Sequence, residues 1–182
     1  MSLKAQKDTL LAELAAYQPY DASEADFVMR TRAFLSAQDA PFSRKTAEGH
    51  ITASAVVVDG SRQAVLLIWH EKLSRWLQPG GHCEPDIDKS VSAAALRELA
   101  EETAIPPQAI TLLSQSVFDL DIHPIPARGN EATHFHYDLR YLFQTDAHRE
   151  GIRWRPIVEI AQSDDESRAR FAKKLLEQTP KN

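Results

Sequence analysis

Hydrophobic side chains recur at helical spacing near the beginning of the chain. One face of a helix over residues 4–17 would carry Leu10, Leu11, Leu14 and Ala15. A second helix is expected to begin at Ser23, because Asp26 three residues later completes a weak capping box. We expect residues 1–45 to form an N-terminal helical extension that serves in docking or dimerisation and carries no chemistry.

From His50 onward the hydrophobic period becomes that of strands, in segments rich in β-branched residues. The expected strands cover residues 51–58, 64–69, 110–120, 135–143 and 152–158. The dipeptide Asp59-Gly60 is a turn signal and predicts a hairpin between the first two strands. Pro79-Gly80-Gly81 predicts a break in regular structure. Helices are expected over residues 90–103 and from a cap at Ser163 to about Gln178.

This order of elements predicts an α/β fold in which a mixed sheet has helices on both faces. The sheet and its helices would form one domain over residues 46–182, preceded by the N-terminal helical extension. A chain of 182 residues fits one domain with a small extra element and is long enough to bury a hydrophobic core. Its 43% hydrophobic and 26% charged residues are close to the average of globular proteins, so disorder is expected only at the ends.

The net charge limits the kinds of partner that we expect, and the cysteine content indicates the compartment. The formal net charge of −5 argues against a surface that binds a nucleic acid polymer, which would need a basic excess. A small phosphorylated substrate remains compatible, since a bound metal ion can supply positive charge locally. No stretch approaches the roughly 18 apolar residues of a membrane span. The single cysteine, Cys83, cannot form an intramolecular disulfide and indicates a reducing, cytoplasmic compartment; we expect no catalytic role for it.

The helix over residues 90–103 carries a cluster of acids. On a helical wheel, Glu98, Glu101 and Glu102 lie within an arc of about 100°. The opposite side, facing the core, would carry Leu96, Leu99, Ala100 and Thr103. Clustered carboxylates repel one another, and Mg²⁺ would remove that repulsion while keeping positions for water and substrate phosphates. Taken alone, the pattern also fits a solvated face with an Arg97–Glu101 ion pair.

The loop before this helix favours a metal site over a solvated face. Gly80-Gly81 lets the backbone approach a ligand closely and can point a carbonyl oxygen at a metal ion. The helix begins within ten residues of these glycines, so the loop and the acids can share one site.

The segment Gly81…Arg97-Glu98-Leu99-Ala100-Glu101-Glu102-Thr103-Ala104-Ile105 resembles the Nudix box, G-x5-E-x7-R-E-U-x-E-E-x-G-U, in which U is aliphatic. A weaker resemblance extends from Thr52 to about Ile160. The resemblance implies an α/β/α sandwich and the activity of a Nudix hydrolase. Such an enzyme would use Mg²⁺ or Mn²⁺ to cleave the diphosphate bond of a nucleoside diphosphate linked to another group.

Carried over position by position, the resemblance implies a role for each matching residue. Glu101 and Glu102 would be metal ligands, and Glu98 would be a ligand or the base that activates water. Arg97 would orient the glutamates, so that Arg97, Glu98 and Glu101 form the catalytic set. The carbonyl group of Gly80 is a further candidate ligand. The metal would lower the pKa of bound water and neutralise charge on the leaving diphosphate.

The sequence departs from the family pattern at two places. The spacing from Gly81 to Arg97 is two residues longer than the pattern, and Lys89 stands where the upstream glutamate belongs. The acids that could replace this glutamate are Asp88, which we favour, Asp86 and Glu84. Ala104 replaces the final glycine, at a position where a left-handed residue would end the helix.

The strand around residues 134–140 is expected to supply one wall of a substrate pocket. His134, His136, Asp138 and Arg140 share one face of it by their period of two. Arginine can contact phosphate oxygens with two nitrogens, and histidine can donate to them or act as acid and base. The expected substrate-binding residues are Gly81, His82, His123, His136, Asp138 and Arg140. Two alternatives remain: a polar edge-strand face in water, and a zinc site formed by His134, His136 and His82.

Two other functions remain open beside the hydrolase. The first is a nucleotide-binding sensor on a Nudix fold without turnover; the intact glutamates argue against it, and the lost upstream glutamate argues mildly for it. The second is isomerase chemistry on an isoprenoid diphosphate, which some Nudix-fold enzymes perform. The expected partner is a small nucleotide-like diphosphate, with no nucleic acid polymer and no membrane, and a homodimer is compatible with the N-terminal helices.

Overall fold

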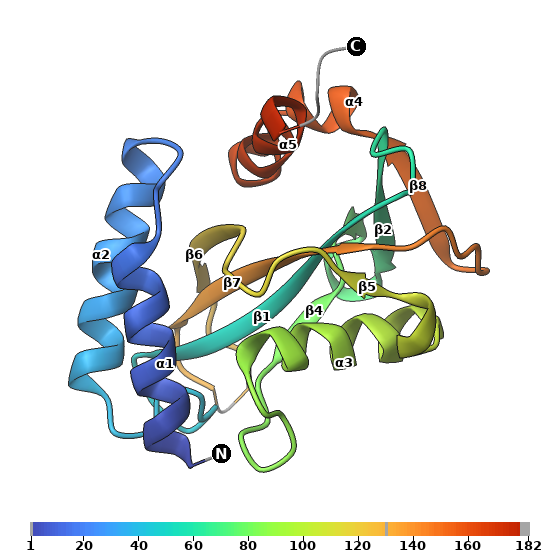
Figure 1. The fold of residues 1–182 in the computed structure, drawn as a ribbon. Coiled ribbons are helices and arrows are strands. Elements are labelled where there is room, and N and C mark those ends of the chain that lie inside the picture. Colours follow the sequence, from blue (N-terminus) through green and yellow to red (C-terminus); the bar gives the residue numbers. More distant parts are fainter. Residues whose placement is uncertain (1, 130, 179–182) are drawn as a thin grey trace.

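The computed structural model describes residues 2–129 and 131–178, whose backbone forms a mixed sheet between two layers of helices (Figure 1). The helices are α1 (Leu3–Ala16), α2 (Ala22–Ala37), α3 (Val91–Thr103), α4 (Ile157–Ala161) and α5 (Glu166–Gln178), with 3-10 turns at Glu71–Leu73 and Pro107–Ala109. The strands are β1 (Gly49–Val58), β2 (Ala64–His70), β3 (Arg75–Leu77), β4 (Gly80–His82), β5 (Thr111–Leu112), β6 (Asp119–Ile125), β7 (His134–Gln144) and β8 (Ile152–Pro156).

Strand β1 is the centre of the sheet. It pairs in parallel with β7 over its full length, from Gly49 opposite Phe135 to Val58 opposite Gln144. It also pairs antiparallel with β2, through the predicted hairpin, and with β4. Strands β5 and β6 extend the sheet from β7, and β3 and β8 extend it from β2. The predicted mixed sheet with helices on both faces is confirmed.

Alternation along β1 builds two hydrophobic cores, one on each face of the sheet. Ala53, Ala55 and Val57 belong to the core beneath α1, α2 and α3. Val56 and Val58 belong to the core beneath α4 and α5. Because both faces are covered, β1 is hydrophobic at nearly every position of its second half, as is typical of a central strand.

The N-terminal helices pack into the first of these cores. Leu10, Leu14, Phe34 and Leu35 are buried in the same cluster as the side chains of β1 and α3. The pair therefore contributes to the core of the fold, while a docking or dimerisation role stays a prediction. Helix α2 begins with Asp21 as its N-cap, so the predicted start at Ser23 with Asp26 is wrong.

Several predicted strand boundaries differ from the structure. The segment 110–120 is not one strand but contains β5 and the first residues of β6, separated by a loop. The Pro-Gly-Gly break contains the short strand β4. Pro124 lies within β6, where a proline is tolerated because, among the described residues, β6 is paired on one side alone, with β7. The last strand ends at Pro156, and α4 follows at once.

In the part of the chain that the structure describes, none of the helices is both long enough and apolar enough to cross a bilayer.

Candidate metal and active site

Helix α3 is placed by local sequence signals at both of its ends. The Ser90 hydroxyl caps it by accepting a hydrogen bond from the backbone amide of Ala93, 3.1 Å away. It ends at Ala104, whose φ of 54° and ψ of 20° are left-handed, as the family pattern predicts for that position. Its buried face includes Val91 and Leu99, which lie in the core, while Glu98 and Glu102 lie against strand β4 and Glu101 is exposed.

Strand β4 brings the two glycines against α3 and β1. A Cβ atom on Gly81 would lie 2.4 Å from the Glu98 carboxylate, and one on Gly80 would lie 2.3 Å from the Ser54 hydroxyl oxygen. At Gly80 the backbone atoms of Ala53 and Ser54 also lie within 2.8 Å of that Cβ, so this position needs glycine, whereas at Gly81 the flexible Glu98 side chain would have to move. The loop and the acidic helix therefore share one site, as the spacing predicted.

Arg97 organises this site with all of its donors. Its Nε and Nη2 atoms donate to the two carboxylate oxygens of Asp88, each at 3.0 Å. Its Nη1 atom donates to Glu98 at 2.9 Å and to Glu101 at 3.2 Å, and Nη2 also donates to the carbonyl oxygen of His82 at 2.8 Å. A planar guanidinium with five donors can hold several acceptors at once, which a lysine cannot do. Arg97 thus links Glu98 and Glu101 of α3 to the backbone of β4.

Of the three acids that could replace the upstream glutamate, Asp88 contacts Arg97. Asp88 is buried, and its second carboxylate oxygen also accepts from the backbone amide of Glu84 at 2.7 Å. The side chains of Glu84 and Asp86 are exposed. This arrangement agrees with the preference for Asp88 over the other two.

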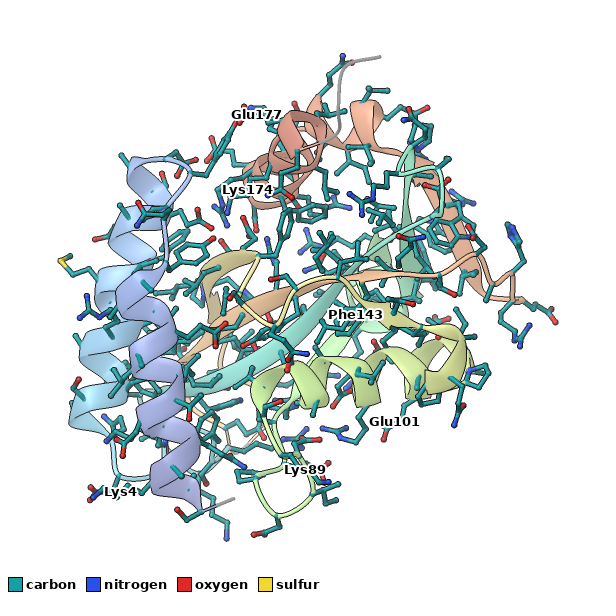
Figure 2. The ribbon with its side chains drawn as sticks, in the orientation of Figure 1. Lys4, Lys89, Glu101, Phe143, Lys174 and Glu177 are labelled. Atoms are coloured by element: carbon teal, nitrogen blue, oxygen red, sulfur yellow. The ribbon has the colours of Figure 1, made fainter. Side chains whose placement is uncertain are left out.

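The carboxylates of Glu98 and Glu101 are close enough to that of Glu102 for their charges to act on it. The Glu102 carboxylate accepts from the Gly80 amide at 2.9 Å. Partial burial, together with the charges of Glu98 and Glu101, raises the pKa of Glu102 despite that hydrogen bond. The Glu101 side chain is 58% exposed and points outward from α3 (Figure 2), which leaves it room to reorient. A divalent cation would relieve the mutual repulsion of these carboxylates.

The predicted pocket wall on β7 is largely buried instead of open. Arg140 is 2% exposed, and its three nitrogens donate to Asp138 at 3.2 Å, Asp119 at 2.9 Å and the Ser167 hydroxyl at 2.7 Å. Asp138 is 3% exposed and also accepts from the Ser54 hydroxyl. Helix α5 covers these side chains, so the expectation that Asp138 and Arg140 contact substrate is corrected: both are engaged with protein partners.

The histidines at the other end of this polar face lie close together. The rings of His82, His123 and His134 are each within 5.5 Å of the His136 ring, centroid to centroid. A fourth neighbour, His50 on β1, was missed in the sequence because it stands alone before a hydrophobic strand. The signal that could have found it is the polar alternation His50-Thr52-Ser54, which matches His136-Asp138-Arg140 on β7 in register.

Comparison with known proteins agrees with this geometry. The family model described as NUDIX domain matches residues 49–177, which is more than half of the chain. The chain belongs to the Nudix family. The match begins with β1 and ends within α5, so the glutamates of α3 and the glycines of β4 lie inside it.

Solved structures of Nudix proteins have a similar fold. The C. elegans Ap4A hydrolase is 17% identical with a TM-score of 0.51, and the match covers 70% of this chain and 96% of that one. The Nudix hydrolase RenU from M. smegmatis is 16% identical with a TM-score of 0.50, covering 74% and 91%. A Nudix family hydrolase from Clostridium perfringens is 19% identical with a TM-score of 0.49, covering 71% and 98%. At these identities the similarity concerns the fold. Comparison with curated protein sequences gave no match.

Proposed function

We propose that this Nudix protein is a hydrolase that uses Mg²⁺ or Mn²⁺ to cleave the diphosphate bond of a nucleoside diphosphate linked to another group. The observation that carries the proposal is the use of Arg97, which ties Asp88, Glu98, Glu101 and the His82 carbonyl into one cluster. A purely structural helix face would not need five donors from one side chain to order three carboxylates around a glycine pair.

Each residue has a defined part in this proposal. Glu98, Glu101 and Glu102, with the Gly80 carbonyl group, would hold the metal ion. The bound metal would supply a nucleophilic water and neutralise charge on the leaving diphosphate. Glu98 would accept the proton of the attacking water, and Arg97 would keep Glu98 in place for that transfer. The missing side chain at Gly81 leaves room for the Glu98 carboxylate next to the backbone.

Cys83 has no part in the reaction. Burial, the largest effect, and the charge of Asp88 raise the pKa of its thiol far above its usual value. A thiol in this state is not a nucleophile. The isomerase alternative gains no support from it.

The test is Mg²⁺-dependent hydrolysis by the full chain on a panel of nucleoside diphosphate sugars, dinucleoside polyphosphates and nucleoside triphosphates. We expect turnover of at least one class, and a loss of about 10²-fold or more in kcat for Glu102→Gln, because one charge that stabilises the metal and the developing anion is removed. The matched control is Glu150→Gln, an exposed acid outside the site, which should keep wild-type kinetics.

The alternatives give different results when an isoprenoid diphosphate is added to the panel. Nucleotide binding without turnover by the wild-type protein would favour the sensor. Conversion of an isoprenoid diphosphate without release of phosphate would favour the isomerase. Wild-type turnover in folded Glu102→Gln would contradict the assignment of the glutamates.

A further inference from the structure

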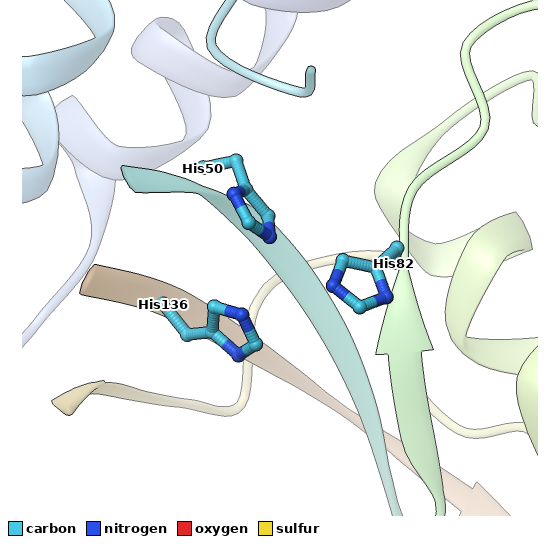
Figure 3. A group of neighbouring side chains, drawn as sticks. All are labelled: His50, His82 and His136. Atoms are coloured by element: carbon cyan, nitrogen blue, oxygen red, sulfur yellow. The ribbon is translucent and has the colours of Figure 1, made fainter. Parts of the chain in front are cut away.

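Three histidines from three strands converge at one end of neighbouring strands in the sheet (Figure 3). His50 lies on β1, His136 lies opposite it on β7, and His82 closes β4 on the other side of β1. Their ring centroids are 4.7 Å (His50–His136), 5.0 Å (His50–His82) and 5.3 Å (His82–His136) apart. Each ring offers a nitrogen atom within 4.8 Å of the nitrogens offered by the other two. The pleat and register of the sheet thus place three imidazoles around one point.

His50 gives an independent reason to expect a ligand at that point. It is 2% exposed, yet neither Nδ1 nor Nε2 has a hydrogen-bond partner among the described residues. A buried polar atom without a partner costs about 1–3 kcal/mol, so such atoms in a native fold generally mark a water or an ion. Stacking of neutral rings would explain the packing of this cluster but would leave both nitrogens unsatisfied.

Imidazole is a common metal ligand in proteins. A neutral imidazole has one nitrogen with a lone pair that can coordinate a metal ion.

We propose that His50, His82 and His136 bind a Zn²⁺ ion, separate from the hard cation that the glutamates of α3 would hold. Imidazole nitrogen binds Zn²⁺ in preference to Mg²⁺. Three histidines with an open fourth position form a known class of zinc site. Zn–N bonds of about 2.0–2.1 Å require nitrogens about 3.3 Å apart, so the rings must close from their present spacing by rotation about their side-chain bonds. The fourth position would hold water or a substrate atom.

Arg44 contacts one of the three histidines and must move before that histidine can bind a metal ion. Its Nη2 atom lies 2.5 Å from Nδ1 of His82 and donates to it, which puts the ring proton of the neutral His82 on its other nitrogen. If His82 binds the metal ion through this other nitrogen, Nε2, its ring proton must move to Nδ1 and Arg44 must move away. The Arg44 side chain is exposed, so it can leave without disturbing the core.

The site is joined to the active site through one residue. The His82 side chain faces the other histidines, while its carbonyl oxygen accepts from Arg97 on the opposite side of β4. A ligand on the zinc ion would therefore lie one strand away from the glutamate cluster.

The experiment measures zinc binding by the full, tag-free chain after removal of metals by a chelator. Competition with a chromophoric zinc chelator gives stoichiometry and affinity, and Co²⁺ in place of Zn²⁺ reports coordination through the intense visible bands of a four- or five-coordinate ion. We expect one high-affinity Zn²⁺ per chain, such bands with Co²⁺, and a rise in melting temperature with Zn²⁺. His82→Ala and His136→Ala should each weaken binding more than about 100-fold, which exceeds the usual effect of losing a ligand's supporting hydrogen bond.

Two control variants test whether Zn²⁺ binds at these three histidines and not at another histidine or at the glutamates of α3. His148→Ala removes an exposed histidine outside the cluster, and Glu102→Gln removes a ligand of the glutamate site; both should bind Zn²⁺ like the wild type. His82 and His136 are only partly buried, so their alanine variants are expected to fold, and circular dichroism checks this. Absence of Zn²⁺ binding, undiminished binding in both histidine variants, or loss of binding in Glu102→Gln alone would each overturn the proposal. The readout does not depend on hydrolysis, so failure of the proposed activity would be seen separately.

Discussion

Replacing Glu24 by alanine tests how α1 and α2 are held to the rest of the fold. Glu24 is 0% exposed, and its carboxylate accepts hydrogen bonds from the Tyr17 hydroxyl at 2.6 Å and from the backbone amides of Tyr20 at 2.7 Å and Leu120 at 3.1 Å. It also pairs with the ammonium group of Lys174, which reaches from α5 (Figure 2). One side chain thus connects α2 with α5 and with β6.

The cost of removing this carboxylate follows from what it leaves behind. The Leu120 amide loses its partner, and the buried Lys174 keeps only its contact with Asp119 at 3.0 Å as an ion pair. Breaking a buried ion pair from one side costs about 3–5 kcal/mol. An unfolding entropy of about 2.1 cal/mol/K per residue over the whole chain gives about 0.38 kcal/mol/K, so the melting temperature should fall by about 8–13 °C.

Thermal and urea unfolding followed by circular dichroism measure this loss. The control is Asp26→Ala on the same helix, whose ion pair with Arg30 is 3.5 Å long and about half exposed. That pair is expected to contribute less than about 0.5 kcal/mol. If Glu24→Ala and Asp26→Ala melt at the same temperature, the buried network does not hold the helices and the reasoning fails.

Three further predictions concern the end of α3, the glycine loop and acid stability. Ala104→Gly should stabilise the fold by up to about 1 kcal/mol, since Ala104 has a positive φ; a loss of stability in urea would contradict it. Gly81→Ala should lower hydrolysis without unfolding the protein, because its Cβ would displace the Glu98 carboxylate; wild-type kcat would show that this carboxylate is not fixed. Burial raises the pKa of the Asp119 carboxyl group, but the positive charges of Arg140 on β7 and of Arg170 and Lys174 on α5 lower it by more. The pKa of Asp119 is therefore below its usual value. A lowered folded-state pKa contributes stability above about pH 4, the unfolded value, and loses it as pH falls further; equal urea midpoints at pH 7 and pH 3 would refute this.

What could be predicted from sequence is what local sequence determines. The Ser90 cap, the spacing of Leu99 in the apolar face, and the arc of three glutamates all lie within one helix, and α3 formed as predicted. The Asp59-Gly60 turn is equally local, and it joined β1 to β2. The sequence also predicted that the glycines and the acids lie close together, because the loop and the helix are adjacent in the chain.

What could not be predicted depends on partners far along the chain. Alternation placed Asp138 and Arg140 on one face correctly, but only the fold shows that α5 covers that face through Ser167. Strand β4 is three residues long, and it forms because β1 offers an edge to Gly80 and its neighbours. The place of His50 in the histidine cluster could not be predicted, because only the parallel pairing of β1 with β7 brings His136 beside it.

The parallel pairing of β1 with β7 also determines the order in which the molecule can assemble. The paired residues Thr52 and Asp138 are 86 positions apart, and Glu24 and Lys174 are 150 positions apart. Contacts between such distant residues close slowly, because the entropy of the intervening loop is lost before the contact forms. During synthesis, α1, α2 and the hydrophobic β1 leave the ribosome well before β7 and α5 exist. The contact of α2 with α5 therefore forms late, and until β7 is made β1 exposes hydrophobic surface of the kind that favours aggregation.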